Sequence, residues 1–297
     1  MQLGALLPLG DIGGDPQVVS EYALAAENIG YDFIEAPDHV LGVNAASRPG
    51  WDRNDNDDLF HDPFVLFGYL AGCTTDLGFS TGVLILPQRQ TALVAKQAAC
   101  LDVLCGGRFR LGIGVGWNEV EFVGLNENFH NRGRRSEEQV QIMQKLWAEP
   151  HVSVKGRYHT IEDAGINPRP TSGRVPVWYG GHHERTLERV AKWGDGWMPN
   201  AYPPDQSALD VFAKLRSLTE AAGRDPAQIG IEVWVAMGEG EEADWAREAR
   251  FWKAAGASHL CLTTTFNRRH HKRIAGDTMS DHLAALHRYH SAVAGEL

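Results

Sequence analysis

The chain lacks both the long apolar runs of membrane proteins and the paired cysteines of disulfide-rich secreted proteins. Within its 297 residues no apolar stretch approaches a membrane span, which takes about 20 residues. The N-terminus begins directly with a strand-like run over residues 2–7, without the basic and apolar regions of a signal peptide. Cys73, Cys100, Cys105 and Cys261 form no C-x-x-C pair. We therefore expect reduced core thiols in a cytoplasmic protein.

A basic stripe and a recognisable metal motif are missing as well. The formal net charge is −10 with acidic and basic residues interleaved, which argues against nucleic acid as a partner. The first expected strand, QLGALLPLG, contains no histidine or carboxylate, and His182-His183-Glu184 lacks the H-E-x-x-H spacing. We expect no metal, and a small molecule as the substrate.

Short apolar runs alternate with amphipathic helical stretches along the chain. In the stretch 16–29, for example, Val19, Tyr22 and Ala26 share one helical face. Alternating strands and helices predict a parallel sheet, and eight such units predict a (β/α)₈ TIM barrel spanning 1–297 as one domain. Strands are expected at 2–7, 31–36, 77–85, 109–115, 175–180, 195–199, 229–236 and 258–264, and helices at 16–29, 90–104, 137–147, 182–193 and 207–222.

Two insertions interrupt this alternation, after the second and the fourth strands. Residues 37–61 include GWDRNDNDD, and so long a loop in a compact domain is usually a functional lid or is disordered. Residues 151–170 indicate a hairpin that turns at Lys155-Gly156.

Chemistry in a TIM barrel concentrates where strands end, so the residues there are the candidates for function. Asp38 and His39 close the second strand and suit proton transfer or cofactor hydrogen bonding, although a solvated loop pair would look the same. Gly82 in the third strand indicates a bulge or a close backbone approach to a ligand, or only a packing glycine.

Glycines also end the fourth and fifth strands. Gly112, Gly114 and Gly116 form G-x-G-x-G, which is not a dinucleotide fingerprint because Trp117 replaces the last glycine. These glycines leave room in the barrel or beside a planar ligand, with Trp117 and Glu121 near the mouth.

Gly180 and Gly181 lead directly into a helix whose N–H groups suit a phosphate, with His182 and His183 as further donors; a plain turn is the alternative. Two basic groups could serve a phosphate or an anionic substrate, or be surface charges. They are Arg132, Arg134 and Arg135, and the run from Arg268 to Arg273.

In this order, the strand-end motifs resemble the bacterial luciferase-like superfamily of flavin and deazaflavin oxidoreductases. The likeness runs over roughly residues 2–200 and continues more weakly to the end. The segments that carry it are EAPDH (35–39), STGVLILP (80–87), GGRFRLGIGVGWNEVEF (106–122), RGRRSEEQV (132–140), NPRP with VPVWYGGH (167–182) and GDGWMP (194–199).

The resemblance implies a cofactor ring at the barrel mouth. A non-proline cis peptide at Gly82-Val83 would support the ring, with Asp38 and His39 as catalytic residues, His39 handling a proton and Asp38 fixing it. The other implied cofactor-binding residues are Gly116, Trp117, Gly180, Gly181 and His182. From the first basic group, Arg134 is the further residue that we expect to bind the cofactor.

The second-strand Asp-His pair and the GxGW element look more like the branch that uses coenzyme F420. The resemblance thus implies an F420-dependent oxidoreductase that transfers hydride. An FMN-dependent monooxygenase using FMNH₂ and O₂ is the alternative, and a barrel that has lost its cofactor is a third. The family also leads us to expect a homodimer.

The segment after GDGW reads MPNAYPPDQ, without the lysine that sugar-phosphate dehydrogenases of the family use. Trp51, Phe60 and Trp117 point instead to an apolar or aromatic substrate, or serve as lid packing.

Overall fold

Eight parallel strands close into a barrel in the computed structural model, which describes residues 1–200 and 202–297. Strand β1 pairs with β2 on one side and with β11 on the other, and β3 pairs with β5, which closes the ring. The predicted TIM barrel is confirmed. Its strands are β1 (Gln2–Leu6), β2 (Phe33–Ala36), β3 (Gly78–Thr81), β5 (Phe109–Gly114), β8 (Val177–Gly180), β9 (Gly196–Met198), β10 (Gly230–Ala236) and β11 (His259–Thr263).

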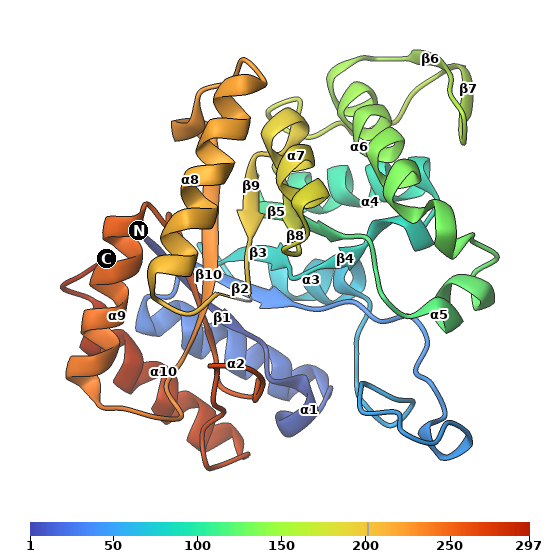
Figure 1. Ribbon diagram of the computed structural model, residues 1–297. Helices are drawn as coiled ribbons and strands as arrows, with labels where there is room; N and C mark the ends of the chain where they lie inside the picture. Colours follow the sequence, from blue (N-terminus) through green and yellow to red (C-terminus); the bar gives the residue numbers. More distant parts are fainter. Residues whose placement is uncertain (201) are drawn as a thin grey trace.

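Helices surround the barrel, and local chemistry sets their ends (Figure 1). Helix α2 (Pro16–Ile29) begins at Asp15, whose side chain accepts the Gln17 N–H, and ends at Gly30 in the left-handed conformation. No helix of the described residues is long and apolar enough to cross a membrane. The others are α1 (Leu9–Ile12), α3 (Pro63–Ala71), α4 (Thr91–Leu104), α5 (Glu119–Gly124), α6 (Arg132–Ala148), α7 (Glu184–Trp193), α8 (Gln206–Ala221), α9 (Glu242–Ala255) and α10 (Met279–Val293).

The third barrel strand is interrupted where the sequence predicts one continuous strand over 77–85. After β3 the chain passes through Gly82 and Val83 into β4 (Leu84–Ile85), which pairs with β5. The Gly82–Val83 peptide bond is cis, as the resemblance implies. A Cβ on Gly82 would come within 2.1 Å of the Glu35 side chain, so only glycine fits this position.

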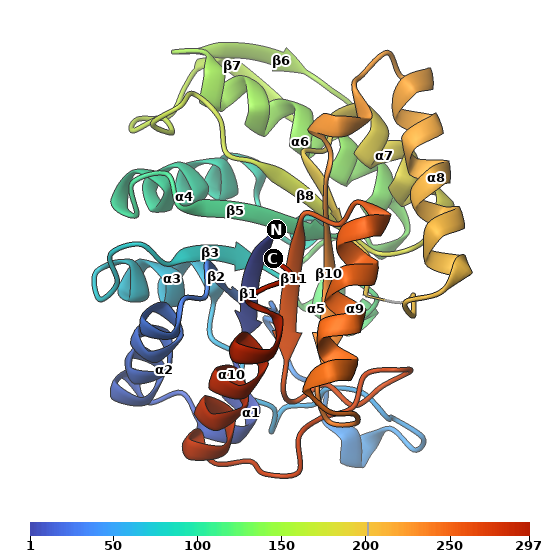
Figure 2. The same ribbon diagram turned by 90° about the vertical axis from the view of Figure 1, so that its left-hand side faces the viewer.

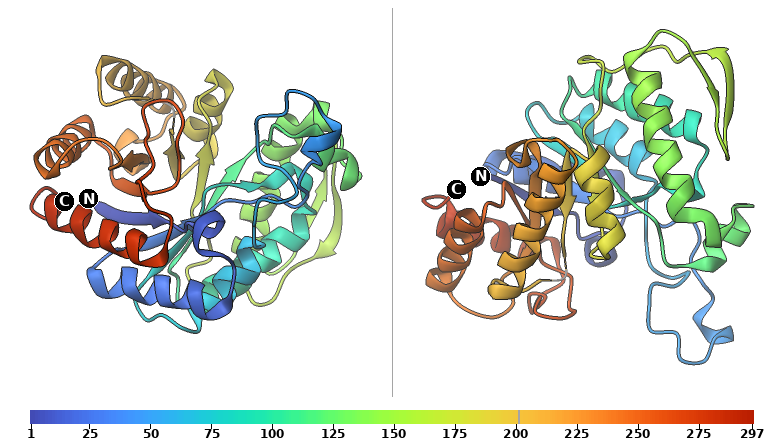
Figure 3. Two further views of the ribbon diagram at one scale, coloured as in Figure 1. Left: turned by 90° about the horizontal axis from the view of Figure 1, so that it is seen from below. Right: turned by 45° about the horizontal axis from the view of Figure 1, so that its top comes forward.

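The two insertions lie at opposite ends of the barrel. The loop 37–61 extends from the end where the strands finish, and one 3₁₀ turn, Ala45–Ser47, forms within it (Figure 1). The hairpin of β6 (Val152–Lys155) and β7 (Thr160–Ala164) precedes the N-terminal end of β8 and lies at the top of Figure 2, and the two termini lie side by side near the centre of that view. Figure 3 shows the mouth end from below, with loop 37–61 beside it.

Candidate active site at the barrel mouth

His39 follows β2 at the mouth, and a carboxylate from another element holds its ring. Nδ1 of His39 lies 3.3 Å from Oε2 of Glu121, on α5. Glu121 also accepts the backbone N–H groups of Val40 at 2.9 Å and Leu41 at 3.3 Å. Burial opposes ionisation of Glu121, but the hydrogen bonds from His39, Leu41 and Val40 outweigh it and lower the pKa. An ionised Glu121 accepts the Nδ1 hydrogen and leaves Nε2 of His39 to exchange a proton.

Asp38 does not fix His39, and this part of the sequence prediction is wrong. Its buried carboxylate accepts from Nη2 of Arg89 at 2.7 Å and from the Ile85 N–H at 3.0 Å. The Asp38 and His39 side chains thus bind different elements: Asp38 binds the segment 85–89, and His39 binds Glu121 of α5. Asp38 therefore ties the end of β2 to the third-strand segment.

A cavity of about 480 Å³ opens at the mouth, and His39 lines it. We call it the mouth cavity. Phe60 from loop 37–61 also lines it and packs edge-on against His39, with ring centroids 4.8 Å apart. Trp51 and Trp117 pack on each other at 5.7 Å and do not line this cavity. Of the three predicted loop aromatics, Phe60 thus faces a ligand space, while Trp51 and Trp117 form lid packing.

A smaller cavity of about 70 Å³ lies deeper and shares Trp234 with the mouth cavity. Its walls bring together residues that the sequence analysis singled out on different strands. These are Gly82 and Val83 of the third strand and Gly180 and Gly181 after β8, joined by Glu35, Met198, Asn200 and Trp234.

Beneath this cavity, the barrel interior holds a charged cluster that the sequence analysis missed. Glu35 accepts the Trp234 Nε1 hydrogen at 2.8 Å, and Arg110 forms an ion pair with Glu232. Burial, and then the charge of Glu232, raise the pKa of Glu35 well above its ordinary value. A charged residue inside each otherwise apolar strand (FIEA, FRLGIG and GIEVWVA) is the signal that could have revealed it.

Glu35, Glu232 and Cys261 place possible ligand atoms within 4.8 Å of one another. The Arg110 guanidinium already neutralises Glu232, and a cation there would be repelled by it. The cluster is therefore better described as an internal ion pair with a protonated neighbour than as a metal centre.

The glycines of β5 make room for the third strand. A Cβ on Gly114 would approach the Val83 side chain to 2.6 Å, and one on Gly112 would reach the Thr81 carbonyl oxygen at 1.9 Å. Gly116 has a φ of 74° and its carbonyl accepts from Arg132, while Trp117 lies under Arg53. Neither residue lines the deep or the mouth cavity, so their contact with a cofactor stays a prediction.

The turn between β8 and α7 leads outward from the deep cavity. Gly181 has a φ of 107°, and its carbonyl accepts the Trp197 Nε1 hydrogen at 2.7 Å. His183 caps α7: its Nδ1 accepts the Arg185 N–H at 3.1 Å. His182 is exposed, and partial burial, Arg269 and His183 lower its pKa.

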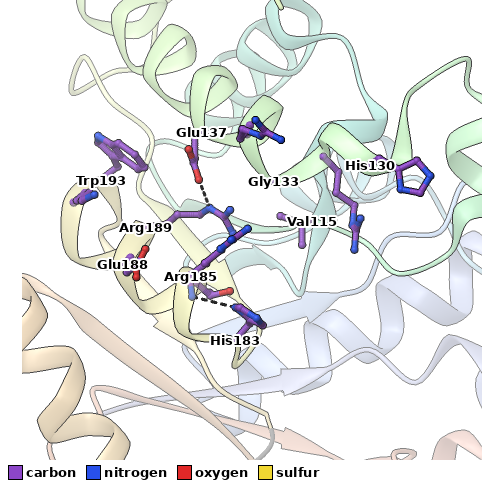
Figure 4. Close-up of a pocket in the computed structure, with 13 residues that line it drawn as sticks. Val115, His130, Gly133, Glu137, His183, Arg185, Glu188, Arg189 and Trp193 are labelled. Atoms are coloured by element: carbon purple, nitrogen blue, oxygen red, sulfur yellow. Dashed lines mark hydrogen bonds and ion pairs between the residues drawn. The ribbon is translucent and has the colours of Figure 1, made fainter.

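A third cavity, of about 770 Å³, lies between the start of α6 and the length of α7, from His183 to Trp193 (Figure 4). We call it the basic pocket. Arg189 is paired with Glu137, as the dashed line in Figure 4 marks. Within the described chain, Arg134, Arg185 and Lys192 have no carboxylate within 4.0 Å. The basic wall of this pocket consists of His130, Arg132, Arg134, His183, Arg185, Arg189 and Lys192.

Arg132 and Arg134 therefore line the basic pocket, and their contact with a phosphate stays a prediction. Arg135 does not line this pocket: it is buried and bound to Glu127 and to the Pro87 carbonyl. Its place on α6, one residue beyond Arg134, turns its side chain towards the barrel.

A family model described as luciferase-like monooxygenase matches residues 4–294. The chain is 35% identical over 211 residues to an uncharacterised protein, Rv0940c, of Mycobacterium tuberculosis, covering 68% of this chain and 71% of that one.

Two other relatives carry functional names. The chain is 28% identical over 242 residues to the F420-dependent hydroxymycolic acid dehydrogenase of Mycobacterium tuberculosis, covering 80% of this chain and 63% of that one. It is 28% identical over 243 residues to the pyrimidine monooxygenase RutA of Allorhizobium ampelinum, covering 75% and 64%.

Among solved structures, an F420-dependent secondary alcohol dehydrogenase in complex with an F420-acetone adduct superposes with a TM-score of 0.76. The two share 20% identity, over 100% of this chain and 99% of that one, so this likeness shows the fold. Because the family model matches nearly the whole length, the chain belongs to the luciferase-like monooxygenase family.

Proposed function

We propose that this protein is an F420-dependent oxidoreductase that transfers hydride between the deazaflavin and a small organic substrate. Family membership and the likeness to an F420-dependent dehydrogenase support an oxidoreductase of this kind. The observation that carries the choice of cofactor is the basic pocket beside the Gly180-Gly181 turn.

The basic pocket suits a cofactor that continues beyond its phosphate. FMN ends at a phosphate, whereas F420 bears a phosphate followed by a chain of carboxylates. A space of about 770 Å³ with three cationic side chains free of carboxylate partners in the described chain, Arg134, Arg185 and Lys192, exceeds what one phosphate needs. Arginine and lysine are the side chains that bind phosphates and carboxylates.

The residues around the deep cavity and the start of α7 are the ones that this cofactor would contact. Gly180 and Gly181 would approach the phosphate with their backbone at the start of α7, as glycine-rich helix starts do. Gly82 and Val83 would lie against the ring, since they line the deep cavity together with Gly180. The deazaflavin supplies hydride at a ring carbon; the protein supplies placement and electrostatics.

His39 would hold the proton that accompanies hydride transfer. Its Nδ1 faces Glu121, so Nε2 is the atom that gives or takes the proton on the side of the mouth cavity. Glu121 acts as a positioning residue that sets the tautomer and orientation of the ring. Phe60 packs on His39 and limits the access of water from the loop side.

The alternative function, an FMN-dependent monooxygenase, draws on the family description and on the likeness to RutA. The two proposals differ in what the basic pocket does. It is a cofactor site in the first and a solvated surface in the second.

Fluorescence titration of the purified protein with F420 and with FMN tests the proposal. We expect F420 to bind. Arg134→Gln and Arg185→Gln should each weaken the affinity for F420 about fivefold, which corresponds to the ~1 kcal/mol of an exposed charge pair. Arg157→Gln, an exposed arginine in the β6–β7 turn, is the matched control. Unchanged F420 affinity in both pocket variants would remove the basic pocket from the cofactor site.

A further inference from the structure

We propose that the mouth cavity selects substrates with an apolar body and a carboxylate group, held by Arg53 and Arg268. This inference rests on the proposed function, because it takes the mouth cavity as the substrate side of the cofactor. The sequence indicated an apolar or aromatic substrate, and the carboxylate is the group that the structure adds.

The size and the apolar lining of the mouth cavity indicate that it encloses an apolar part of the substrate. Its volume of about 480 Å³ is in the range of pockets that enclose small molecules. It meets the deep cavity at Trp234 and contains His39, so a ligand in it would lie beside the proposed proton-carrying residue. Its apolar wall is formed by Leu6, Leu7, Pro8, Leu9, Pro37, Leu59, Phe60 and Phe266.

Two arginines line this cavity from different loops and are held by neutral groups. Arg53, in loop 37–61, lies over the Trp117 ring with its guanidinium carbon 4.5 Å from the centroid. Arg268, in the segment after β11, donates to the Asp52 carbonyl at 2.8 Å. In the described chain neither forms an ion pair with a carboxylate. Both guanidinium groups are thus positioned without being neutralised.

Two carboxylates, Asp11 and Asp58, also line the cavity, and each binds another group of the chain. Asp11 pairs with Arg273 at 2.9 Å and lies 3.2 Å from Nε2 of His282. Asp58 accepts the Asp55 N–H at 2.8 Å within loop 37–61 and has no ion pair among the described residues. Its carboxylate reduces the positive charge at the rim but contacts neither arginine. The net charge left to face a ligand is positive.

The positive rim contrasts with the formal net charge of the chain, which is −10. An acidic surface repels anions in general, so two fixed arginines at one opening give an anionic substrate a local attraction. A carboxylate matches the planar guanidinium with two parallel hydrogen bonds. The exposed arginines would bind the carboxylate at the outer end of the mouth cavity. The apolar body of the substrate would then lie towards Trp234 and His39.

The test uses two probes of equal shape and different charge, 2-naphthoate and 2-naphthamide. Calorimetric titration into the protein, with and without F420, measures their affinities. We expect the acid to bind about tenfold tighter than the amide, a difference of ~1.4 kcal/mol, and the preference to fall as salt is added. In Arg53→Gln/Arg268→Gln the preference disappears. Arg48→Gln, a loop arginine outside the cavity, keeps it.

Equal affinity for the acid and the amide in the unaltered protein would overturn the proposal. An acid preference that survives in the double variant would do so as well. The F420 titration is separate from this experiment. A protein that prefers the acid but does not bind F420 would retain the carboxylate site and lose the proposed cofactor.

Discussion

The buried carboxyl groups of Glu35 and Glu232 make the pH dependence of folding a test of the barrel interior. Both side chains are fully buried, and Arg110 is the cation that contacts Glu232. Burial and the charge of Glu232 raise the pKa of Glu35, against the opposing effect of Arg110. The folded protein therefore holds a proton on Glu35 over a pH range in which the unfolded chain has already released it. Glu35→Gln replaces this acid with a neutral side chain of the same shape.

The size of the effect follows from the linkage between proton binding and folding. Because the pKa of Glu35 is higher in the folded state, its contribution to stability is complete below the unfolded pKa of about 4.3. The contribution is lost as the pH rises towards the folded pKa. Within that window, the free energy of unfolding falls by about 1.4 kcal/mol per pH unit for this one proton. In Glu35→Gln this part of the slope is absent.

Guanidinium-induced unfolding between about pH 5 and about pH 8 measures the slope for both proteins. Contributions from other titrating groups occur in both, so they cancel in the difference. The variant should gain stability relative to the unaltered protein as the pH rises. Glu162→Gln, an exposed glutamate on β7, should show no such divergence. Parallel curves for Glu35→Gln and the unaltered protein would refute a protonated Glu35.

Three further predictions concern the mouth. Gly181→Asp should abolish most F420 binding in fluorescence titration, because the carboxylate repels the phosphate and a φ of 107° disfavours any side chain. Gly223→Asp, which also has a positive φ of 74° but lies away from the mouth, should leave F420 binding unchanged. Equal losses in both variants would mean a general folding defect. His39→Asn should lower kcat by about 10²–10⁴-fold. Glu121→Gln should lower kcat less and should change the pH profile of kcat. An unaltered pH profile in Glu121→Gln would contradict the positioning role of Glu121. Asp38→Asn should destabilise folding by about 1–3 kcal/mol in thermal or chemical unfolding, since Arg89 loses its buried ionised partner and keeps only the more exposed Asp62. An unchanged stability would contradict a stabilising role of the Asp38–Arg89 contact.

The barrel could be predicted from the sequence because its signal is local. Period-two apolar runs and amphipathic stretches depend on a few neighbouring residues, and the helix 16–29 has the same bounds in the structure. Gly82 also followed from local reasoning, since a strand glycine indicates a close approach. The group that approaches, the Glu35 side chain, could not be named from the sequence.

The contacts that decide chemistry connect distant parts of the chain. Asp38 was assigned to His39 because the two are adjacent, but the partner of His39 is Glu121, 82 residues away. Arg110 and Glu232 are separated by 122 residues and meet only because the barrel closes. Arg53 and Arg268 likewise come together at one cavity from loops at opposite ends of the sequence. Partners of this kind depend on strand register and loop placement, which sequence periodicity does not encode.

An F420 site with its anionic tail in the basic pocket can be tested by comparing three ligands in one equilibrium titration. They are F420, the same deazaflavin without phosphate and carboxylates, and FMN. F420 should bind tightest, removal of the tail should weaken binding, and Arg185→Gln should reduce this difference. Tight binding of FMN with none of F420, or equal binding of F420 and its tailless form, would contradict such a site.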